Sequence, residues 1–388
     1  MKSFLLRIVA VFLVVLLSTS FFPTQASASL SRAALIKTFD RISKSTTLAN
    51  PSIVLIDRAT GEIVFEKNPT SARKPASVMK LLSAAVALQY LDADARFQTT
   101  LSLSATPRTV ILSGHFDPWM TSRHVDAVEQ KRVSVSTLGN KVVTKITALE
   151  HVAPKSMTVL YQGVYSTDIV ALSRYLKSRG VTAKFKEVTS GEATKLSIEK
   201  FATVSSPKVR DMVEYALLWS DNLLANRLAL EASTVMGFSR TKPGVAQAFK
   251  TFLTDMNIDT SGLEVKDGAG LSKANRVTAE MVADLLLKVR GDADFAPLYE
   301  GLPVSGISGT LEDRYLTTAP QAVGLVRAKT GTLDGTVSLA GYVEAGAHEY
   351  IFVALADRIK KGFAATNSAR TTLDRLLGSI AAPLTTKS

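Results

Sequence analysis

The stretch Pro75-Ala76-Ser77-Val78-Met79-Lys80 places a serine and a lysine three residues apart, at the start of an apolar run that continues to Leu91. Proline is favoured in the first turn of a helix, where its missing N–H would have had no partner, and the apolar run predicts a helix that enters the core. Ser77 and Lys80 then lie on one face of the first turn. A lysine amine there can take the proton of the serine hydroxyl, and the positive end of the helix favours the oxyanion that follows.

The spacing Ser-x-x-Lys is weak by itself, because four other pairs share it: Ser71/Lys74, Ser197/Lys200, Ser205/Lys208 and Ser239/Lys242. Two downstream motifs single out Ser77. The chain has one Ser-x-Asn, at Ser220-Asp221-Asn222, and one Lys-Thr-Gly, at Lys329-Thr330-Gly331. Together the three motifs predict a nucleophile with a cationic proton relay and no histidine.

The side chains of the two later motifs suit one cleft. In an extended loop Ser220 and Asn222 point the same way and offer a hydroxyl and a carboxamide. At the end of a strand, Lys329-Thr330 offers an ammonium and a hydroxyl, and Gly331 allows the close approach of a substrate backbone, as of an added strand. The same three motifs occur in class A β-lactamases and penicillin-binding proteins.

The regions around the motifs predict an α+β fold. Strands are expected at 52–57 and 62–66 and again at 324–329, 337–343 and 350–356, as one five-stranded antiparallel sheet. Helices at 30–42 and 363–380 would cover one face of this sheet. Further helices are expected at 209–219, 222–236, 244–256 and 279–289, with a loop at Ser220-Asp221 between the first two. The two ends of the chain would therefore form one domain.

Residues 96–203 differ in character, being rich in Thr, Val and Ser. Strands are expected at 99–103, 109–112, 142–147 and 157–162, and a helix at 167–179 that leads to a further strand. We interpret this region as a small inserted α+β domain that divides a peptidase domain into 29–95 and 204–388.

Residues 1–28 have the pattern of a secretory signal peptide. A basic start with Lys2 and Arg7 precedes an apolar stretch at 8–22, and Ala26-Ser27-Ala28 offers a cleavage site before Ser29. An uncleaved membrane anchor is the alternative, although the apolar stretch is short for a span of about 20 residues. We expect a secreted, extracytoplasmic protein in the periplasm or cell envelope.

The amino-acid composition of the chain limits the kinds of partner and cofactor that are expected. The chain has no cysteine, so packing and not disulfides must stabilise it in an oxidising compartment. Its formal net charge of +12 suits an anionic envelope surface or wall polymer, or serves solubility alone. The Lys and Arg residues are scattered, so nucleic acid is not expected as a partner. The four histidines form no His-Glu-x-x-His pair, and neither a metal nor a cofactor is expected.

Three further segments match one known family. Residues 267–272 read Asp-Gly-Ala-Gly-Leu-Ser, residues 302–311 read Leu-Pro-Val-Ser-Gly-Ile-Ser-Gly-Thr-Leu, and residues 328–333 with Gly341-Tyr342 match an end segment. In these segments the chain resembles the D-alanyl-D-alanine carboxypeptidase/endopeptidases among the class C low-molecular-mass penicillin-binding proteins. The resemblance implies a serine β-lactamase/transpeptidase-like fold with an all-helical subdomain beside the five-stranded sheet.

The resemblance also implies roles for the motif residues. Ser77 would attack the carbonyl between two D-alanines, with Lys80 as its base. Ser220 would relay a proton to the leaving amine, and Asn222 would hold the substrate amide. Lys329 would supply positive potential.

Other groups would bind the leaving end of the substrate and the oxyanion. Thr330 and Thr332 would bind the terminal carboxylate, with Gly331 between them. The backbone N–H groups of Ser77 and Thr332 would form the oxyanion hole, in which one donor is worth about 10²–10³ in turnover.

The chain also departs from the family. The interval from Ser77 to Ser220 is short, which implies one reduced insert. Ser-Gly-His-Phe-Asp-Pro at 113–118 stands where the family has Gly-Gly-Gly-Asp-Pro, and Asn226 stands where an acidic residue often occurs. Ala269 and Ser308 are further substitutions. They leave the catalytic groups in place and affect the expected substrate preference.

The sequence therefore predicts a serine-type D-Ala-D-Ala carboxypeptidase that acts on peptidoglycan stem peptides through an acyl-enzyme and is trapped by β-lactams. Endopeptidase action on cross-linked stem peptides is left open. Two alternatives remain open. A β-lactamase would share the acylation and add fast deacylation. A non-catalytic wall-binding protein could keep the same scaffold.

Overall fold

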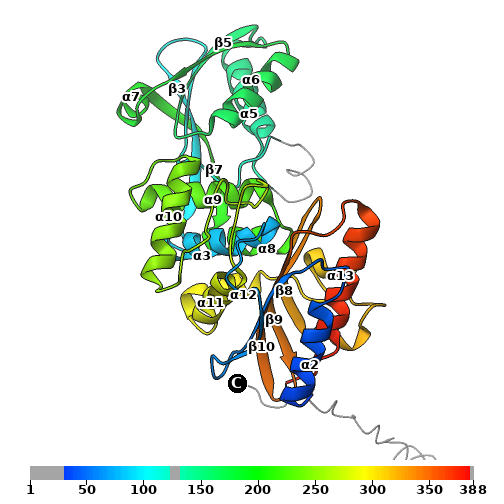
Figure 1. Ribbon diagram of the computed structural model, residues 1–388. Coiled ribbons are helices and arrows are strands. Elements are labelled where there is room, and N and C mark those ends of the chain that lie inside the picture. Colours follow the sequence, from blue (N-terminus) through cyan, green and yellow to red (C-terminus); the bar gives the residue numbers. More distant parts are fainter. Residues whose placement is uncertain (1–29, 123–131, 385–388) are drawn as a thin grey trace, which may run out of the picture.

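The structure, a computed structural model, describes residues 30–122 and 132–384, and the expected signal peptide lies outside these ranges. The chain forms two lobes, each built on its own five-stranded sheet (Figure 1). The sheet of the lower lobe has the order β2-β1-β10-β9-β8. All of its neighbouring strands are antiparallel. The strands are β1 (Ser52–Asp57), β2 (Ile63–Lys67), β8 (Val326–Leu333), β9 (Thr336–Ala345) and β10 (His348–Ala356). The expected sheet is confirmed.

Both faces of this sheet are covered. All six residues of β1 are buried, because alternate side chains face two different cores. Ile53 and Leu55 pack with the helices α2 (Arg32–Ser43) and α13 (Phe363–Gly378). These two helices lie on the same face of the sheet, as the sequence predicts (Figure 1). Val54 and Ile56 belong to the core on the other side.

A helical subdomain covers the second face, and α3 (Lys80–Tyr90) runs through its middle. Residues 80–88 are all buried, as expected for a helix that is apolar on every side. The helices around it are α8 (Val209–Leu218), α9 (Asn222–Val235), α10 (Lys242–Asp255), α11 (Ala279–Val289) and α12 (Ala296–Glu300). This packing fixes the first residue of α3, Lys80, in the interior.

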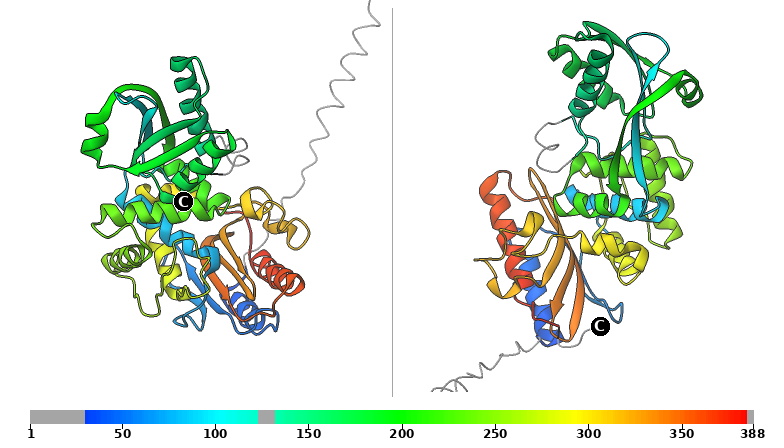
Figure 2. Two further views of the ribbon diagram at one scale, coloured as in Figure 1. Left: turned by 90° about the horizontal axis from the view of Figure 1, so that it is seen from above. Right: turned by 180° about the vertical axis from the view of Figure 1, so that it is seen from behind.

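The upper lobe carries the second sheet, in the order β6-β5-β4-β3-β7. Its strands are β3 (Arg96–Ser104), β4 (Thr109–Ser113), β5 (Ser156–Gln162), β6 (Thr182–Glu187) and β7 (Ser197–Lys208), and its helices are α5 (Val135–Glu150), α6 (Ser166–Ser178) and α7 (Ser190–Leu196). The pairs β4–β5 and β5–β6 are parallel, whereas β3 pairs antiparallel with β4 and β7. The paired β3 and β7 lead from the upper lobe to the helical subdomain (Figure 2).

The expected strand at 142–147 is wrong, because these residues lie inside α5. The run is rich in β-branched residues, which favour strands. However, Leu138, Val142 and Ile146 recur every four residues and are all buried in the core of the upper lobe. Burial of this one helical face outweighs the local propensity.

The strand β7 was not expected from the sequence. Most of its residues are exposed or half-buried, so it lacks the apolar pattern of a strand. It ends at Lys208, beyond the expected end of the insert at residue 203. We therefore propose that the insert runs from β3 to the end of β7.

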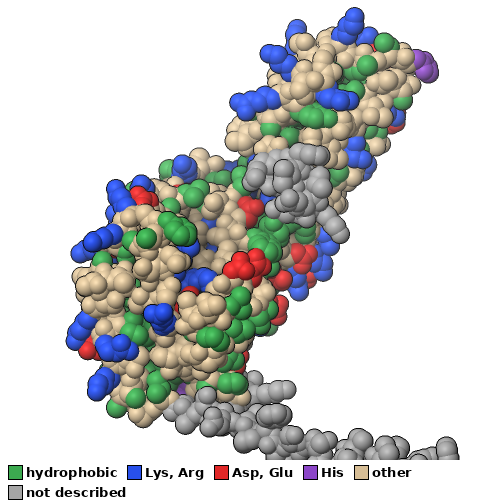
Figure 3. Space-filling model, turned by 90° about the vertical axis from the view of Figure 1, so that its right-hand side faces the viewer, with side chains coloured by type: hydrophobic (Ala, Val, Ile, Leu, Met, Phe, Trp, Pro, Cys, Tyr) green, Lys and Arg blue, Asp and Glu red, His purple; other side chains and the backbone are tan. Residues whose placement is uncertain are grey.

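On the face of the molecule in Figure 3, Lys and Arg side chains are spread over both lobes and form no single stripe. In the part of the chain that the structure describes, no helix is long and apolar enough to cross a membrane.

Candidate active site

Ser77 lies in a short 3₁₀ helix, Ala76–Met79, directly before α3. The α-helix therefore begins at Lys80 and not at Ser77 as the sequence suggested. Ala76 has φ +47°, a left-handed conformation that is uncommon for alanine. Val78 and Met79 are buried, whereas Ser77 is partly exposed. The tight turn thus presents the serine hydroxyl while its neighbours anchor it.

Lys80 joins two of the three motifs. Its Nζ donates to Ser77 Oγ at 2.8 Å, to Asn222 Oδ1 at 2.7 Å and to the carbonyl oxygen of Ala269 at 2.8 Å. The side chain is 1% exposed. Burial lowers the pKa of Lys80 to about 7, although the negative charges of Asp221 and Asp267 oppose the shift. A substantial fraction of this amine is therefore neutral near pH 7 and can accept a proton.

The Ser-Asp-Asn motif forms the junction of α8 and α9, at the loop that the sequence predicts. Ser220 has φ +58°, which turns the chain sharply between the helices. Asp221 is the N-cap of α9 and accepts from the N–H of Leu224 at 2.8 Å. Asn222 is the first residue of the helix, and its side chain reaches Lys80.

The Lys-Thr-Gly motif lies in β8, the edge strand beside the nucleophile. Lys329 is fully buried, and its Nζ donates to the carbonyl of Thr330 at 3.1 Å. Burial, and secondly the charge of Lys80, hold the pKa of Lys329 well below its usual range. A Cβ on Gly331 would lie 2.8 Å from the carbonyl oxygen of Pro75. The glycine therefore permits β8 to pack against the turn that carries Ser77, a reason separate from substrate approach.

Asp267 organises the loop at 267–272, one of the segments that resemble the family. Its carboxylate accepts from the backbone N–H groups of residues 269 to 272. Asn226 Oδ1 accepts from the same N–H of Ala269 at 3.0 Å. Gly270 contacts the carbonyl oxygen of Ala76 so closely that a Cβ would not fit. The loop thereby aims the Ala269 carbonyl at Lys80 and packs behind the nucleophile.

These elements enclose a cleft of about 430 Å³. The residues that line it are Ser77, Ser220, Thr310, Asp313, Arg314, Thr330, Thr332 and Arg370. The structure thus brings Ser77, Ser220, Thr330 and Thr332 to one cavity, with Lys80 and Lys329 buried near its floor. Thr310 and Thr330 share a hydrogen bond of 2.8 Å between their hydroxyls.

Two arginines of the cleft were missed by sequence reasoning. Arg370, on α13, donates to Thr332 Oγ1 at 2.9 Å. Arg314 is ion-paired with Asp374 of the same helix. Among the described residues Arg370 has no carboxylate partner, and burial, followed by the charge of Arg314, lowers its pKa. No motif surrounds Arg370, so only the packing of α13 against the sheet reveals it.

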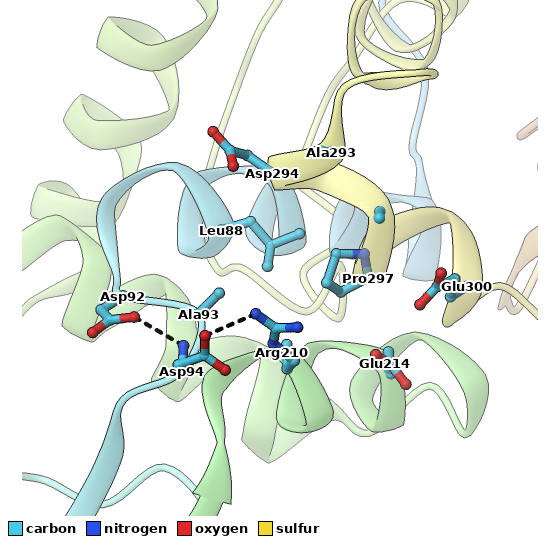
Figure 4. Close-up of a pocket in the computed structure, with 11 residues that line it drawn as sticks. Leu88, Asp92, Ala93, Asp94, Arg210, Glu214, Ala293, Asp294, Pro297 and Glu300 are labelled. Atoms are coloured by element: carbon cyan, nitrogen blue, oxygen red, sulfur yellow. Dashed lines mark hydrogen bonds and ion pairs between the residues drawn. The ribbon is translucent and has the colours of Figure 1, made fainter.

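A second cavity, of about 410 Å³, lies at the far end of α3 (Figure 4). Its wall includes Asp92, Asp94, Glu214 and Arg210, and an ion pair joins Arg210 to Asp94 at 3.0 Å. None of its lining residues belongs to the three motifs. The three motifs therefore contribute nothing to this cavity.

Comparison with known proteins gives the family. Residues 37–157 and 150–379 match the model of the D-Ala-D-Ala carboxypeptidase 3 (S13) family. The chain belongs to this family. It is a serine-type peptidase, and the function expected from its motifs is confirmed at this level.

Two relatives illustrate the match. The chain is 30% identical over 348 residues to carboxypeptidase DacB of Mycolicibacterium smegmatis, a match covering 77% of this chain and 75% of the relative. It is 25% identical over 449 residues to a D-alanyl-D-alanine carboxypeptidase of Actinomadura, a match covering 85% of this chain and 82% of the relative.

Solved structures show the same fold. Penicillin-binding protein 4 of Haemophilus influenzae superposes with a TM-score of 0.68 at 15% identity, over 88% of this chain and 98% of that protein. The expected serine β-lactamase/transpeptidase-like fold is thereby confirmed. A penicillin G-acylated endopeptidase of Bdellovibrio bacteriovorus superposes with a TM-score of 0.58 at 16% identity, over 87% of this chain and 94% of that protein.

Proposed function

We propose that the protein is a D-Ala-D-Ala carboxypeptidase that removes the terminal D-alanine from peptidoglycan stem peptides, with Ser77 as its nucleophile. One observation carries the proposal. Ser77 Oγ lies 2.8 Å from the amine of Lys80, and burial of that amine lowers its pKa to about 7. A serine beside such a base is activated at neutral pH without a histidine.

Acylation follows from these contacts. Lys80 takes the hydroxyl proton as Ser77 Oγ attacks the carbonyl carbon between the two D-alanines. The oxyanion is stabilised by the backbone N–H groups of Ser77 and Thr332. The C–N bond then breaks, and the leaving D-alanine amine receives a proton from Lys80 through the hydroxyl of Ser220.

Deacylation returns the free enzyme. Water gives its proton to Lys80 and attacks the ester carbon, and the Ser77–acyl bond breaks. The proton returns to Ser77 Oγ, and the shortened stem peptide leaves with a new carboxylate.

Substrate binding uses the polar wall of the cleft. Asn222 accepts from Lys80 through Oδ1, which leaves its Nδ2 to donate to the acyl side of the substrate. Thr330, Thr332 and Arg370 bind the terminal carboxylate. Burial lowers the pKa of Lys329, but the charge of a bound carboxylate favours the protonated amine, which then adds positive potential from below. Asp374 neutralises Arg314, so Arg370 supplies the charge that matches the substrate.

We also propose that β-lactams acylate Ser77 in the same cleft and that the mature chain works outside the cytoplasm. The penicillin-acylated neighbour supports the first point, and the signal-peptide pattern of residues 1–28 supports the second. An exported protein that begins at Ser29 would establish the cleavage.

The test is release of D-alanine from an N-acylated peptide ending in Lys-D-Ala-D-Ala. The wild type should release it, and Ser77→Ala should release none. Ser71→Ala is the matched control, because Ser71 and Lys74 have the same Ser-x-x-Lys spacing outside the cleft. The proposal fails if the wild type is inactive on this peptide and on a cross-linked one, or if Ser77→Ala remains active.

A further inference from the structure

The Ser-Asp-Asn motif is tied to the upper lobe by a buried ion pair. Arg132 lies in the segment between β4 and α5, and its Nη1 meets Asp221 Oδ2 at 2.7 Å. The side chain of Arg132 is 1% exposed and that of Asp221 17%. Nε of Arg132 donates to the carbonyl of Trp119 at 2.9 Å, and the guanidinium lies 4.8 Å from the centre of the indole ring. Arg132 is thus held firmly where it meets the motif.

The carboxylate of Asp221 has two separate tasks. Oδ1 accepts from the N–H of Leu224 and caps α9, whereas Oδ2 receives Arg132. The residues on either side of Asp221 are Ser220, which lines the cleft, and Asn222, which contacts Lys80. A displacement of Asp221 that shifts its backbone would therefore move both of these side chains.

A second buried arginine offers a comparison. Arg227, farther along α9, donates to the carbonyl of Met120 at 2.6 Å and pairs with Asp168 of α6 at 2.7 Å, and both side chains are 3% exposed. Its guanidinium lies 4.2 Å from the ring centre of Tyr165. Arg227 therefore ties the same helix to the same lobe, but it touches neither Ser220 nor Asn222 in any contact of the described structure.

We propose that Arg132 is a positioning residue of the reaction: its ion pair with Asp221 holds Ser220 and Asn222 in register with Ser77 and Lys80. The inference rests on the proposed function and extends it, because it gives the upper lobe a part in acylation. A small displacement of a positioned group can lower a rate by about 10²-fold.

The experiment compares Arg132→Met with Arg227→Met. Each breaks a buried ion pair between α9 and the upper lobe, so each should lower the melting temperature by a similar amount. The measured quantity is the second-order rate constant of penicillin acylation at a temperature at which both variants are folded. Arg132→Met should lower it about 10²-fold, whereas Arg227→Met should stay near the wild type. Arg132→Lys, which keeps the charge, should recover part of the loss.

The double variant Arg132→Met/Asp221→Asn keeps the test valid if Arg132→Met fails to fold. It removes both charges and leaves neither buried alone, and asparagine still caps α9. We expect this variant to fold. Its acylation rate should fall as much as that of Arg132→Met, because both variants lose the same ion pair between residues 132 and 221. For D-alanine release, the loss should appear in kcat more than in KM.

The outcomes separate the two claims. If the wild type is not acylated and releases no D-alanine, the proposed function is wrong. If the wild type is active and Arg132→Met acylates at the wild-type rate, the positioning role is refuted. Equal losses in Arg132→Met and Arg227→Met would also refute it, since they would reflect the docking of α9 in general.

Discussion

The active-site cleft and the contact between the lobes both bury cations, but they treat them in opposite ways. Lys80 and Lys329 are almost completely buried, and neither has an ion-pair partner among the described residues. Arg132 and Arg227 are equally buried, and each is paired with a carboxylate at 2.7 Å. Burial strongly lowers the pKa values of the two lysines. The charges of the two arginines are instead balanced by the carboxylates that contact them.

This difference separates buried cations that serve in the reaction from buried cations that stabilise the contact between the lobes. A buried amine without a carboxylate partner is destabilising while it is charged, and it therefore becomes a base near neutral pH. A buried arginine that is paired holds two lobes in one arrangement, and breaking its pair leaves a charge without compensation. Substitution of the unpaired Lys80 should accordingly lower activity more than stability, whereas substitution of Arg227 should lower stability more than activity.

The largest effect on activity should come from the active-site cleft. Lys80→Met removes the base, so the acylation rate should fall about 10²–10⁴-fold. The melting temperature should be unchanged or higher, because methionine fills the space without a buried amine. Penicillin labelling and thermal unfolding of the same preparation measure both quantities. A variant that is much less stable but still active would contradict the comparison.

The largest effect on stability should come from the contact between the lobes. Arg227→Met leaves Asp168 buried without its partner and should lower the free energy of unfolding by about 3–5 kcal/mol. Urea unfolding measures the loss. Arg32→Met is the control, since its ion pair with Glu62 is half exposed and should be nearly neutral. If the two variants unfold alike, the buried pair does not have the role assigned to it.

The lowered pKa of Lys80 predicts a pH dependence. Acylation needs the neutral amine, so its rate should rise with pH through a midpoint of about 7 and should be about 100-fold lower at pH 5. Because the unfolded chain binds this proton up to the ordinary pKa of 10.5, the same group should add stability as the pH rises from about 7 to 10.5. A rate that does not vary between pH 5 and 8 would exclude Lys80 as the base.

A smaller effect is expected at the wall of the cleft. Arg370→Ala should lower kcat/KM for a peptide with a free terminal carboxylate by about 10- to 100-fold, as for loss of a charged hydrogen bond. The same peptide with a terminal carboxamide is the control, and its kcat/KM should change little. An equal loss on both peptides would mean that Arg370 supports the cleft and does not bind the carboxylate.

The residues of the candidate site that belong to short motifs could be predicted from the sequence. Ser77, Lys80, Asn222 and the Lys329 segment could be placed because each motif occurs at the end of a recognisable helix or strand. The sheet could be predicted as well, since its strands are apolar runs with clear turns.

The rest depends on contacts between distant segments. Arg370 comes from the last helix and has no motif around it, and the pair between Arg132 and Asp221 joins two lobes. The strand expected at 142–147 was wrong because tertiary burial of one helical face outweighed β-branched composition. These features follow from packing, and neither local propensity nor spacing encodes them.

The central claim is that Ser77 is the nucleophile. The most direct measurement is the mass of the intact mature protein after incubation with penicillin, followed by peptide mapping over time. We predict an adduct of one penicillin on the peptide that contains Ser77, stable for minutes or longer, and none on Ser77→Ala. A wild type that is neither labelled nor able to consume penicillin, or an adduct on another residue, would contradict the claim; rapid consumption of penicillin without a lasting adduct would identify a β-lactamase instead.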